Sequence, residues 1–94
     1  MKFVAILKDK RTGELTEELL KKHVEHLQHL SQRSKLFICG PLKDQDRAMQ
    51  IFICDTMGEA ITLVESDPFV KEGYYAGYEV NELLEANEKN NWLM

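Results

Sequence analysis

The order of strand-like and helix-like segments constrains the fold of this 94-residue chain more than any other feature. Apolar runs of strand length, bounded by charged or turn-forming residues, occupy residues 2–8, 35–42, 48–55 and 74–82. Helix signals stand between them. Thr16 is a candidate N-cap for a helix over residues 16–34, and Thr56 opens a capping box for a second helix over residues 56–66. The predicted order is therefore β-α-β-β-α-β.

This order is the split βαβ arrangement of ferredoxin-like domains. Right-handed crossover connections place both helices on the same face of the sheet. We therefore predict an α+β, ferredoxin-like βαββαβ domain with a four-stranded antiparallel sheet and its helices on one face. A second subunit stacked on the other face would bury it, so we expect a homodimer, as a dimeric α+β barrel. We assign residues 1–83 to this domain and residues 84–94 to a C-terminal extension.

Charge and cysteine patterns narrow the possible partners and location. The net charge of −4, with no run of Lys and Arg, argues against nucleic-acid binding. The apolar run at residues 3–7 is too short for a signal peptide or a membrane span. Cys39 and Cys54 each lie in an apolar run without the spacing of a zinc site. We interpret both as free core thiols of a cytoplasmic protein that binds neither nucleic acid nor membranes.

Two ionisable residues occupy positions that packing alone does not favour. At about 100° per residue, His23 projects onto the apolar stripe of the first helix, beside Leu19 and Leu27. Asp67 stands at the end of the second helix, where the helix dipole disfavours a carboxylate. We interpret His23 and Asp67 as a candidate catalytic pair. The alternative is a core histidine bonded to a backbone carbonyl, together with an Asp-Pro turn.

The spacing of the three histidines also raises the possibility of a metal site. His23 and His26 share one face of the first helix, whereas His29 projects outside it. A structural zinc site needs four ligands and a catalytic one three, and the sequence does not supply the remainder at recognisable spacing. We therefore predict no metal ion and no cofactor.

Other residues are candidates for a ligand pocket. Gly40 and Pro41 end the second strand, and either stop it or line a pocket with accessible backbone. In the last strand, alternation places Tyr74 and Tyr78 on one face and Tyr75 on the other. Such tyrosines either donate hydrogen bonds to a ligand or pack at an interface. The predicted substrate pocket consists of Gly40, Pro41, His26, Tyr75 and Tyr78.

Four short elements occur in a recognisable order, namely His23-Val24-Glu25-His26-Leu27, Leu36-Phe37-Ile38-Cys39-Gly40-Pro41, Glu59-Ala60 and Asp67-Pro68-Phe69-Val70. With them, residues 1–83 resemble the YCII-related (YciI-like) domain family, ferredoxin-like proteins allied to the dimeric α/β barrels. The resemblance implies that His23 and Asp67 match the family's proposed catalytic histidine and aspartate. Its relatives include muconolactone isomerase-like and chloromuconolactone dehalogenase-like proteins. They imply proton-transfer or elimination chemistry on a small organic acid or lactone.

The resulting functional hypothesis is a small cofactor-free enzyme, similar to a lyase or an isomerase. In it, His23 acts as general acid or base on a small organic acid or lactone, and Asp67 fixes its tautomer. One alternative is a non-catalytic dimeric module that binds a small metabolite in the same cleft. Another is a structural domain with a core histidine. The catalytic hypothesis requires the two side chains to meet within hydrogen-bond distance in a concave site.

Overall fold

The secondary structure follows the predicted order, with one additional helix. The structure, a computed structural model, describes residues 1–94. Its elements are β1 (Lys2–Lys10), α1 (Glu17–Gln32), β2 (Leu36–Pro41), β3 (Ala48–Ile53), α2 (Met57–Glu65), α3 (Pro68–Lys71), β4 (Tyr75–Leu83) and a terminal 3-10 segment, η1 (Glu88–Leu93). The sequence predicts only a turn after Pro68, whereas the structure forms the short helix α3 there.

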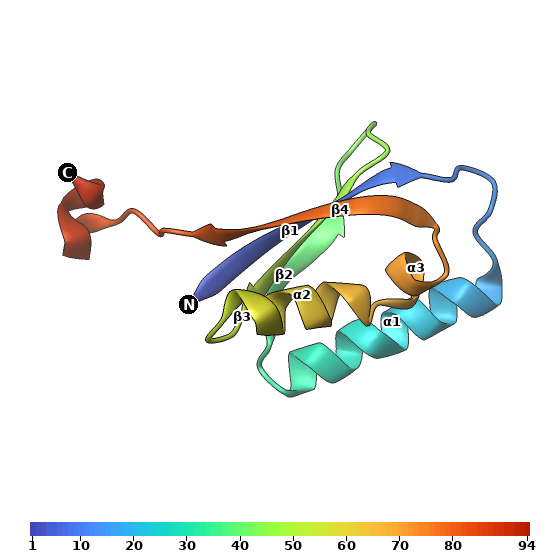
Figure 1. Cartoon of the computed structure of the whole chain (residues 1–94), viewed down its shortest axis with the longest axis horizontal. Helices are drawn as coiled ribbons and strands as arrows, with labels where there is room; N and C mark the ends of the chain where they lie inside the picture. The colour runs from blue at the N-terminus through green and yellow to red at the C-terminus, as the bar shows by residue number, and fades with distance from the viewer.

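The four strands form one antiparallel sheet in the order β2-β3-β1-β4. The three α-helices lie on the same side of this sheet (Figure 1). This is the ferredoxin-like α+β arrangement, and the predicted fold class is confirmed. Pro41 ends β2 at the edge of the sheet, where its missing N–H costs no ladder hydrogen bond. Association of two subunits stays a prediction.

Threonine side chains begin both long helices, as the sequence predicts. The hydroxyl of Thr16 accepts a hydrogen bond from the Leu19 amide at 3.1 Å, and that of Thr56 accepts one from the Glu59 amide at 3.1 Å. Each bond satisfies an amide that has no partner inside the helix. The Glu59 carboxylate also pairs with Lys35 Nζ at 2.8 Å, which ties the start of α2 to the residue before β2.

The hydrophobic core lies between the sheet and the helices. Alternate side chains of the central strands face it, including Phe3, Leu7 and Phe52. They pack against the buried faces of α1 and α2, represented by Leu30 and Val64. The helices thus cover one face of the sheet and leave the other without cover from this chain.

Strand alternation breaks near the end of β1. Leu7 and Lys10 would fall on opposite faces of a regular strand, yet both line the same cavity. Between them, Asp9 has a φ of +57°, a left-handed conformation that aspartate adopts more readily than most residues. Because of this local change of backbone direction, the Lys10 side chain reaches the side of the sheet that the helices cover.

The prediction that Tyr75 takes the face opposite to Tyr74 and Tyr78 is wrong, because all three side chains lie on the side of the sheet that the helices cover. Tyr74 lies just before β4, so strand alternation does not govern it, and Tyr75 pairs with Lys10 beyond the irregularity in β1. Both tyrosines are buried, and their rings meet edge to face with centroids 5.3 Å apart. Tyr78, opposite Leu7, instead packs at the margin of the core.

The C-terminal residues extend away from the sheet after β4 (Figure 1). The regular structure of this C-terminal extension is limited to η1, in which Asn91 and Trp92 have left-handed backbone angles. The apolar side chains of this segment are exposed, with Trp92 at 57%. No helix of the chain combines the length and the apolar character needed to span a bilayer.

Candidate functional site

A cavity of about 450 Å³ lies between the sheet and the helices α1 and α3. This volume falls within the range typical of small-molecule sites. Most of its wall is apolar, and the polar groups come from a few residues only. The lining residues are Leu7, Lys10, Leu15, Leu20, His23, Leu27, Cys39, Gly40, Pro41, Ala48, Met49, Gln50, Phe69, Tyr74 and Tyr75.

His23 and Asp67 meet at the wall of this cavity. His23 lies in the middle of α1 and Asp67 between α2 and α3, and the His23 Nδ1 atom lies 2.8 Å from Asp67 Oδ1. The imidazole also stacks on the ring of Phe69, with centroids 3.7 Å apart and an angle of 7° between the planes. The geometric requirement set by the sequence, a hydrogen-bonded pair in a concave site, is met.

Asp67 has a structural role that its position in the sequence conceals. Ser66 is the C-cap of α2, and Asp67 is the N-cap of α3, with Pro68 in the first turn. Its Oδ1 accepts the Phe69 amide at 2.8 Å. The supposed unfavourable carboxylate at the end of one helix is therefore a favourable cap at the start of the next.

Gln50 completes the environment of this carboxylate. Its Nε2 donates to Asp67 Oδ2 at 2.7 Å, from a β3 side chain that faces the helices. Asp67 is fully buried and Gln50 is 2% exposed. Both carboxylate oxygens thus have side-chain partners, Oδ1 on His23 and Oδ2 on Gln50.

The environment of Asp67 determines the ionisation of its carboxyl group and, through it, which nitrogen of His23 donates the hydrogen bond. Burial acts to raise the pKa of Asp67, but the hydrogen bond and charge of His23, followed by the bonds from Gln50 and the Phe69 amide, outweigh it and lower that pKa below its ordinary value. The carboxylate is therefore ionised at neutral pH and can only accept hydrogen bonds. His23 Nδ1 is therefore the donor of the hydrogen bond to Asp67, and in the tautomer that this bond selects the lone pair of the ring lies on Nε2.

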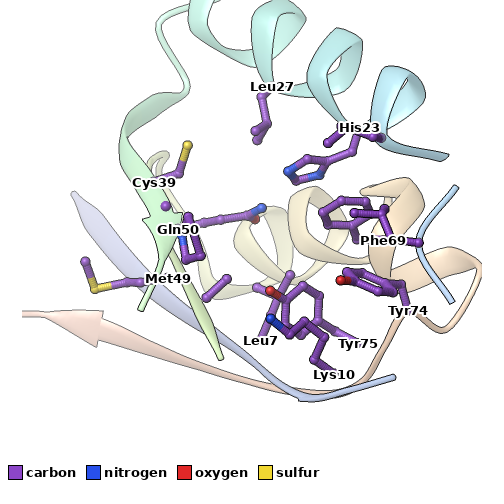
Figure 2. A pocket seen from close by; sticks show the side chains of 15 residues that line it. Leu7, Lys10, His23, Leu27, Cys39, Met49, Gln50, Phe69, Tyr74 and Tyr75 are labelled. Atoms are coloured by element: carbon purple, nitrogen blue, oxygen red, sulfur yellow. The ribbon is translucent and has the colours of Figure 1, made fainter. Parts of the chain in front are cut away.

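The second ring nitrogen of His23 is open to the cavity. The only hydrogen bond of this side chain is the one from Nδ1, and Nε2 is not among the fully buried atoms that lack a partner. In Figure 2 the imidazole projects from α1 toward the centre of the cavity, above Phe69 and beside the end of the Gln50 side chain. The arrangement presents a basic nitrogen, oriented by a carboxylate, to any molecule that enters.

Three of the five residues predicted for the pocket line the cavity, namely Gly40, Pro41 and Tyr75. Gly40 contributes main chain, and a Cβ added to it would meet no atom within 4 Å. His26 and Tyr78 are not brought there. His26 lies near the Leu63 backbone in α2, and burial lowers its pKa despite the nearby Asp67 charge. Tyr78 donates its hydroxyl to Glu65 Oε2 at 2.6 Å.

Sequence reasoning missed three polar lining residues, Gln50, Lys10 and Tyr74. Gln50 carried a usable signal, because it is a polar residue between Ala48 and Phe52 on the inward face of a strand. Lys10 carried none, since its orientation depends on the left-handed backbone of Asp9. Tyr74 lies just before β4, so strand alternation does not predict the direction of its side chain.

The site has no arrangement typical of a metal centre or an activated thiol. No three residues among His, Cys, Asp and Glu lie close enough together to hold a metal ion. Cys39 lines the cavity, but burial, followed by the negative charge of Asp67, raises the pKa of its thiol. Its thiolate is therefore disfavoured. Among the titratable side chains that line the cavity, only His23 is hydrogen-bonded to a carboxylate.

Fold and site together define a small α+β domain with a ligand-sized cavity and a histidine–aspartate pair between its sheet and helices, in which the carboxylate is buried and the imidazole lines the cavity. The chain belongs to the YCII-related domain family, whose family model matches residues 1–84. A search of the curated proteins finds no match.

A solved structure resembles this chain over its full length. It is 5-chloro-2-hydroxyhydroquinone dehydrochlorinase from Burkholderia phenoliruptrix, in complex with 2,5-dihydroxybenzoquinone. The two chains are 28% identical, the match covers 97% of this chain and 100% of that chain, and the TM-score is 0.67.

Proposed function

We propose that this protein is a small enzyme that uses His23 and Asp67 for general acid–base chemistry on a small organic acid or lactone. One observation carries the proposal. The Nδ1 atom of His23 is held 2.8 Å from a buried carboxylate oxygen while the ring lines a ligand-sized cavity. The similar dehydrochlorinase is by its name an enzyme that removes hydrogen chloride, a reaction that includes a proton transfer.

The proton moves between the substrate and His23 Nε2. Nε2 accepts a proton from an acidic O–H or C–H group of the bound molecule, and the imidazolium that forms is stabilised by the ionised Asp67. In an isomerisation the same nitrogen then returns the proton to another atom of the substrate. In an elimination the leaving group departs with its bonding electron pair as the new double bond forms, and Nε2 afterwards releases the proton to solvent. A positioned acid–base group of this kind contributes about 10²–10⁴-fold to a rate.

The lining of the cavity is suited to a small, mainly apolar ligand that carries one negatively charged group. Its wall consists largely of aliphatic and aromatic side chains, which favour a ring or a lactone. Lys10 supplies the only permanent cation of the lining, and its ammonium makes no salt bridge within the protein. A carboxylate or an oxyanion of the substrate would complement it. In this proposal the proton transfers are carried out by protein side chains, without a cofactor.

The open face of the sheet supports the predicted homodimer as part of the proposal. Ile38, Ile51 and Val4 are register partners across three neighbouring strands, on the face opposite to the buried Phe52. Ile38 is 52% exposed. A row of branched aliphatic residues on an uncovered sheet face is more typical of an interface than of a solvated surface. We propose that a second copy of the chain covers it.

The decisive experiment compares turnover and binding in matched histidine variants. Wild type, His23→Asn, Asp67→Asn and His29→Asn would be assayed for chloride release from 5-chloro-2-hydroxyhydroquinone and for isomerisation of muconolactone. His29 is an exposed histidine of the same helix, so its variant controls for the substitution itself. We expect a loss of about 10²-fold or more in the His23 variant, a loss in the Asp67 variant, and none in the control.

Two results would contradict the proposal. Full turnover by His23→Asn would remove the histidine from the chemistry. Tight binding of these compounds by wild type without any turnover would instead favour the non-catalytic binding module. Binding measured by a shift in melting temperature separates the second result from a simple failure of the compounds to enter the cavity.

A further inference from the structure

Gln50 holds a hydrogen-bond acceptor that no protein group satisfies. Its side chain is 2% exposed and lines the cavity, and its Nε2 is engaged by Asp67 at 2.7 Å. Its Oε1 is fully buried and has no hydrogen-bond partner. The only other such side-chain atom is His26 Nε2, which belongs to a residue outside the cavity lining. Buried polar atoms without partners are rare and costly in folded proteins.

The ionised Asp67 fixes which end of the Gln50 amide carries this acceptor. A carboxylate accepts hydrogen bonds and cannot donate them, so the amide must direct its NH₂ group at Asp67 Oδ2. The carbonyl oxygen is then directed away from the carboxylate. An amide turned the other way would set Oε1 against a negative oxygen, which is unfavourable.

The acceptor lies beside the basic nitrogen of the site. One carboxylate binds His23 through Oδ1 and Gln50 through Oδ2. The imidazole and the amide are therefore neighbours on the cavity wall, as Figure 2 shows. A ligand close enough to exchange a proton with His23 Nε2 comes close to Gln50 Oε1 as well.

We propose that Gln50 Oε1 accepts a hydrogen bond from a hydroxyl group of the substrate, beside the group that exchanges its proton with His23. This inference rests on the proposed function and specifies its substrate class, a small hydroxylated ring compound with at least one un-ionised O–H. Gln50 is then a specificity-determining residue, because an analogue without that hydroxyl leaves the buried carbonyl unpaired. Discrimination of about 5- to 150-fold in affinity is expected from one such group.

The inference is tested with two ligands that differ by one hydroxyl. Dissociation constants of 1,2,4-trihydroxybenzene and 1,4-dihydroxybenzene would be measured by calorimetry under anaerobic conditions. Wild type should prefer the triol by about 5- to 150-fold. Gln50→Met, which keeps the side-chain length and removes both polar atoms, should bind the two ligands about equally. Gln28→Met makes the same change on the exposed surface of α1 and should keep the wild-type preference.

The outcomes separate this inference from the proposed function. Equal affinity of wild type for the two ligands, no binding of the triol, or a preference that persists in Gln50→Met would overturn the role of Gln50. If Gln50→Met does not fold, equal affinity of wild type for the two ligands still overturns the role of Gln50. A preference that depends on Gln50 without turnover by wild type would support the hydroxyl site and reject the enzyme. Turnover that depends on His23, without a preference for the triol, would support the enzyme and reject the hydroxyl site.

Discussion

The imidazole of His23 and the ring of Phe69 stack with centroids 3.7 Å apart and planes inclined by 7°. Phe69 follows Asp67 by two residues, so one short segment supplies both the carboxylate at the edge of the imidazole and the flat surface beneath it. The hydrogen bond restricts rotation of the ring in its own plane, and the stack restricts its tilt. This double restraint holds the imidazole in a fixed direction.

The low pKa of Asp67 predicts a specific loss of stability in acid. The folded-state pKa lies below the ordinary value of 3.8, so the ionised carboxylate stabilises the fold above that value. The contribution is lost as the pH falls through the folded-state pKa. Between about pH 5 and about pH 2, urea unfolding should show a larger loss for wild type than for Asp67→Asn, which keeps a capping side chain but cannot ionise. Parallel pH profiles would contradict this.

His26 is expected to oppose folding when it is protonated. Burial lowers its pKa below 6.5 in the folded state, with partial compensation by Asp67. Its neutral form therefore stabilises the fold above the unfolded-state pKa, and this contribution is lost as the pH falls below that value. His26→Leu should be as stable as wild type or more stable at about pH 7.5, because it removes an unpartnered buried nitrogen, and its advantage should increase toward about pH 5.5. Thermal unfolding at both pH values measures the difference. A smaller advantage at the lower pH would show that His26 is not held neutral.

Lys10 should bind the negative group of an acidic ligand. In a His23→Asn background that prevents turnover, Lys10→Gln is expected to weaken binding of the muconolactone carboxylate by about 10-fold or more. Lys8→Gln is the matched control, because Lys8 pairs with Glu79 at 2.8 Å and does not line the cavity. Calorimetry at two salt concentrations would show the effect most clearly. Equal losses in both lysine variants would indicate a general charge effect.

The row of aliphatic residues on the open sheet face, Ile38, Ile51 and Val4, should control subunit association. Ile38→Lys places a charge at the β2 end of the proposed interface and is expected to yield monomers. The residue is already 52% exposed, so the fold of one subunit should tolerate the change. Val24→Lys introduces the same charge at a 41% exposed valine of α1 and should leave association unchanged. Sedimentation velocity distinguishes these outcomes, and a monomeric wild type would reject the interface.

The fold was predictable from the sequence because its signals are local and agree with one another. The threonine caps at Thr16 and Thr56 and the four apolar runs each specify an element. With the handedness of crossover connections, the order of those elements specifies the sheet. The helix α3 was not predicted because it spans only Pro68–Lys71, and a single turn of helix has too few residues to show a periodic pattern.

The candidate site was predictable only in part, because it depends on distant pairs and on one irregular torsion. Periodicity places His23 on the inward face of α1, but no local rule shows that Asp67, 44 residues later, lies 2.8 Å away. Gln50 joins the same carboxylate from a third element. Such contacts arise only when the fold is assembled. The resemblance to the YCII-related family pointed to His23 and Asp67 as a pair but carried no information on their geometry.

The left-handed residue in β1 has a consequence for how related sites can diversify. Asp9 lies outside the cavity, yet its φ of +57° decides whether the ammonium of Lys10 reaches the cavity or the opposite face of the sheet. Glycine or asparagine at this position would preserve that choice, whereas a β-branched residue would favour extended backbone and withdraw the charge. One substitution at a residue outside the cavity would thus be enough to remove the only lysine from its lining.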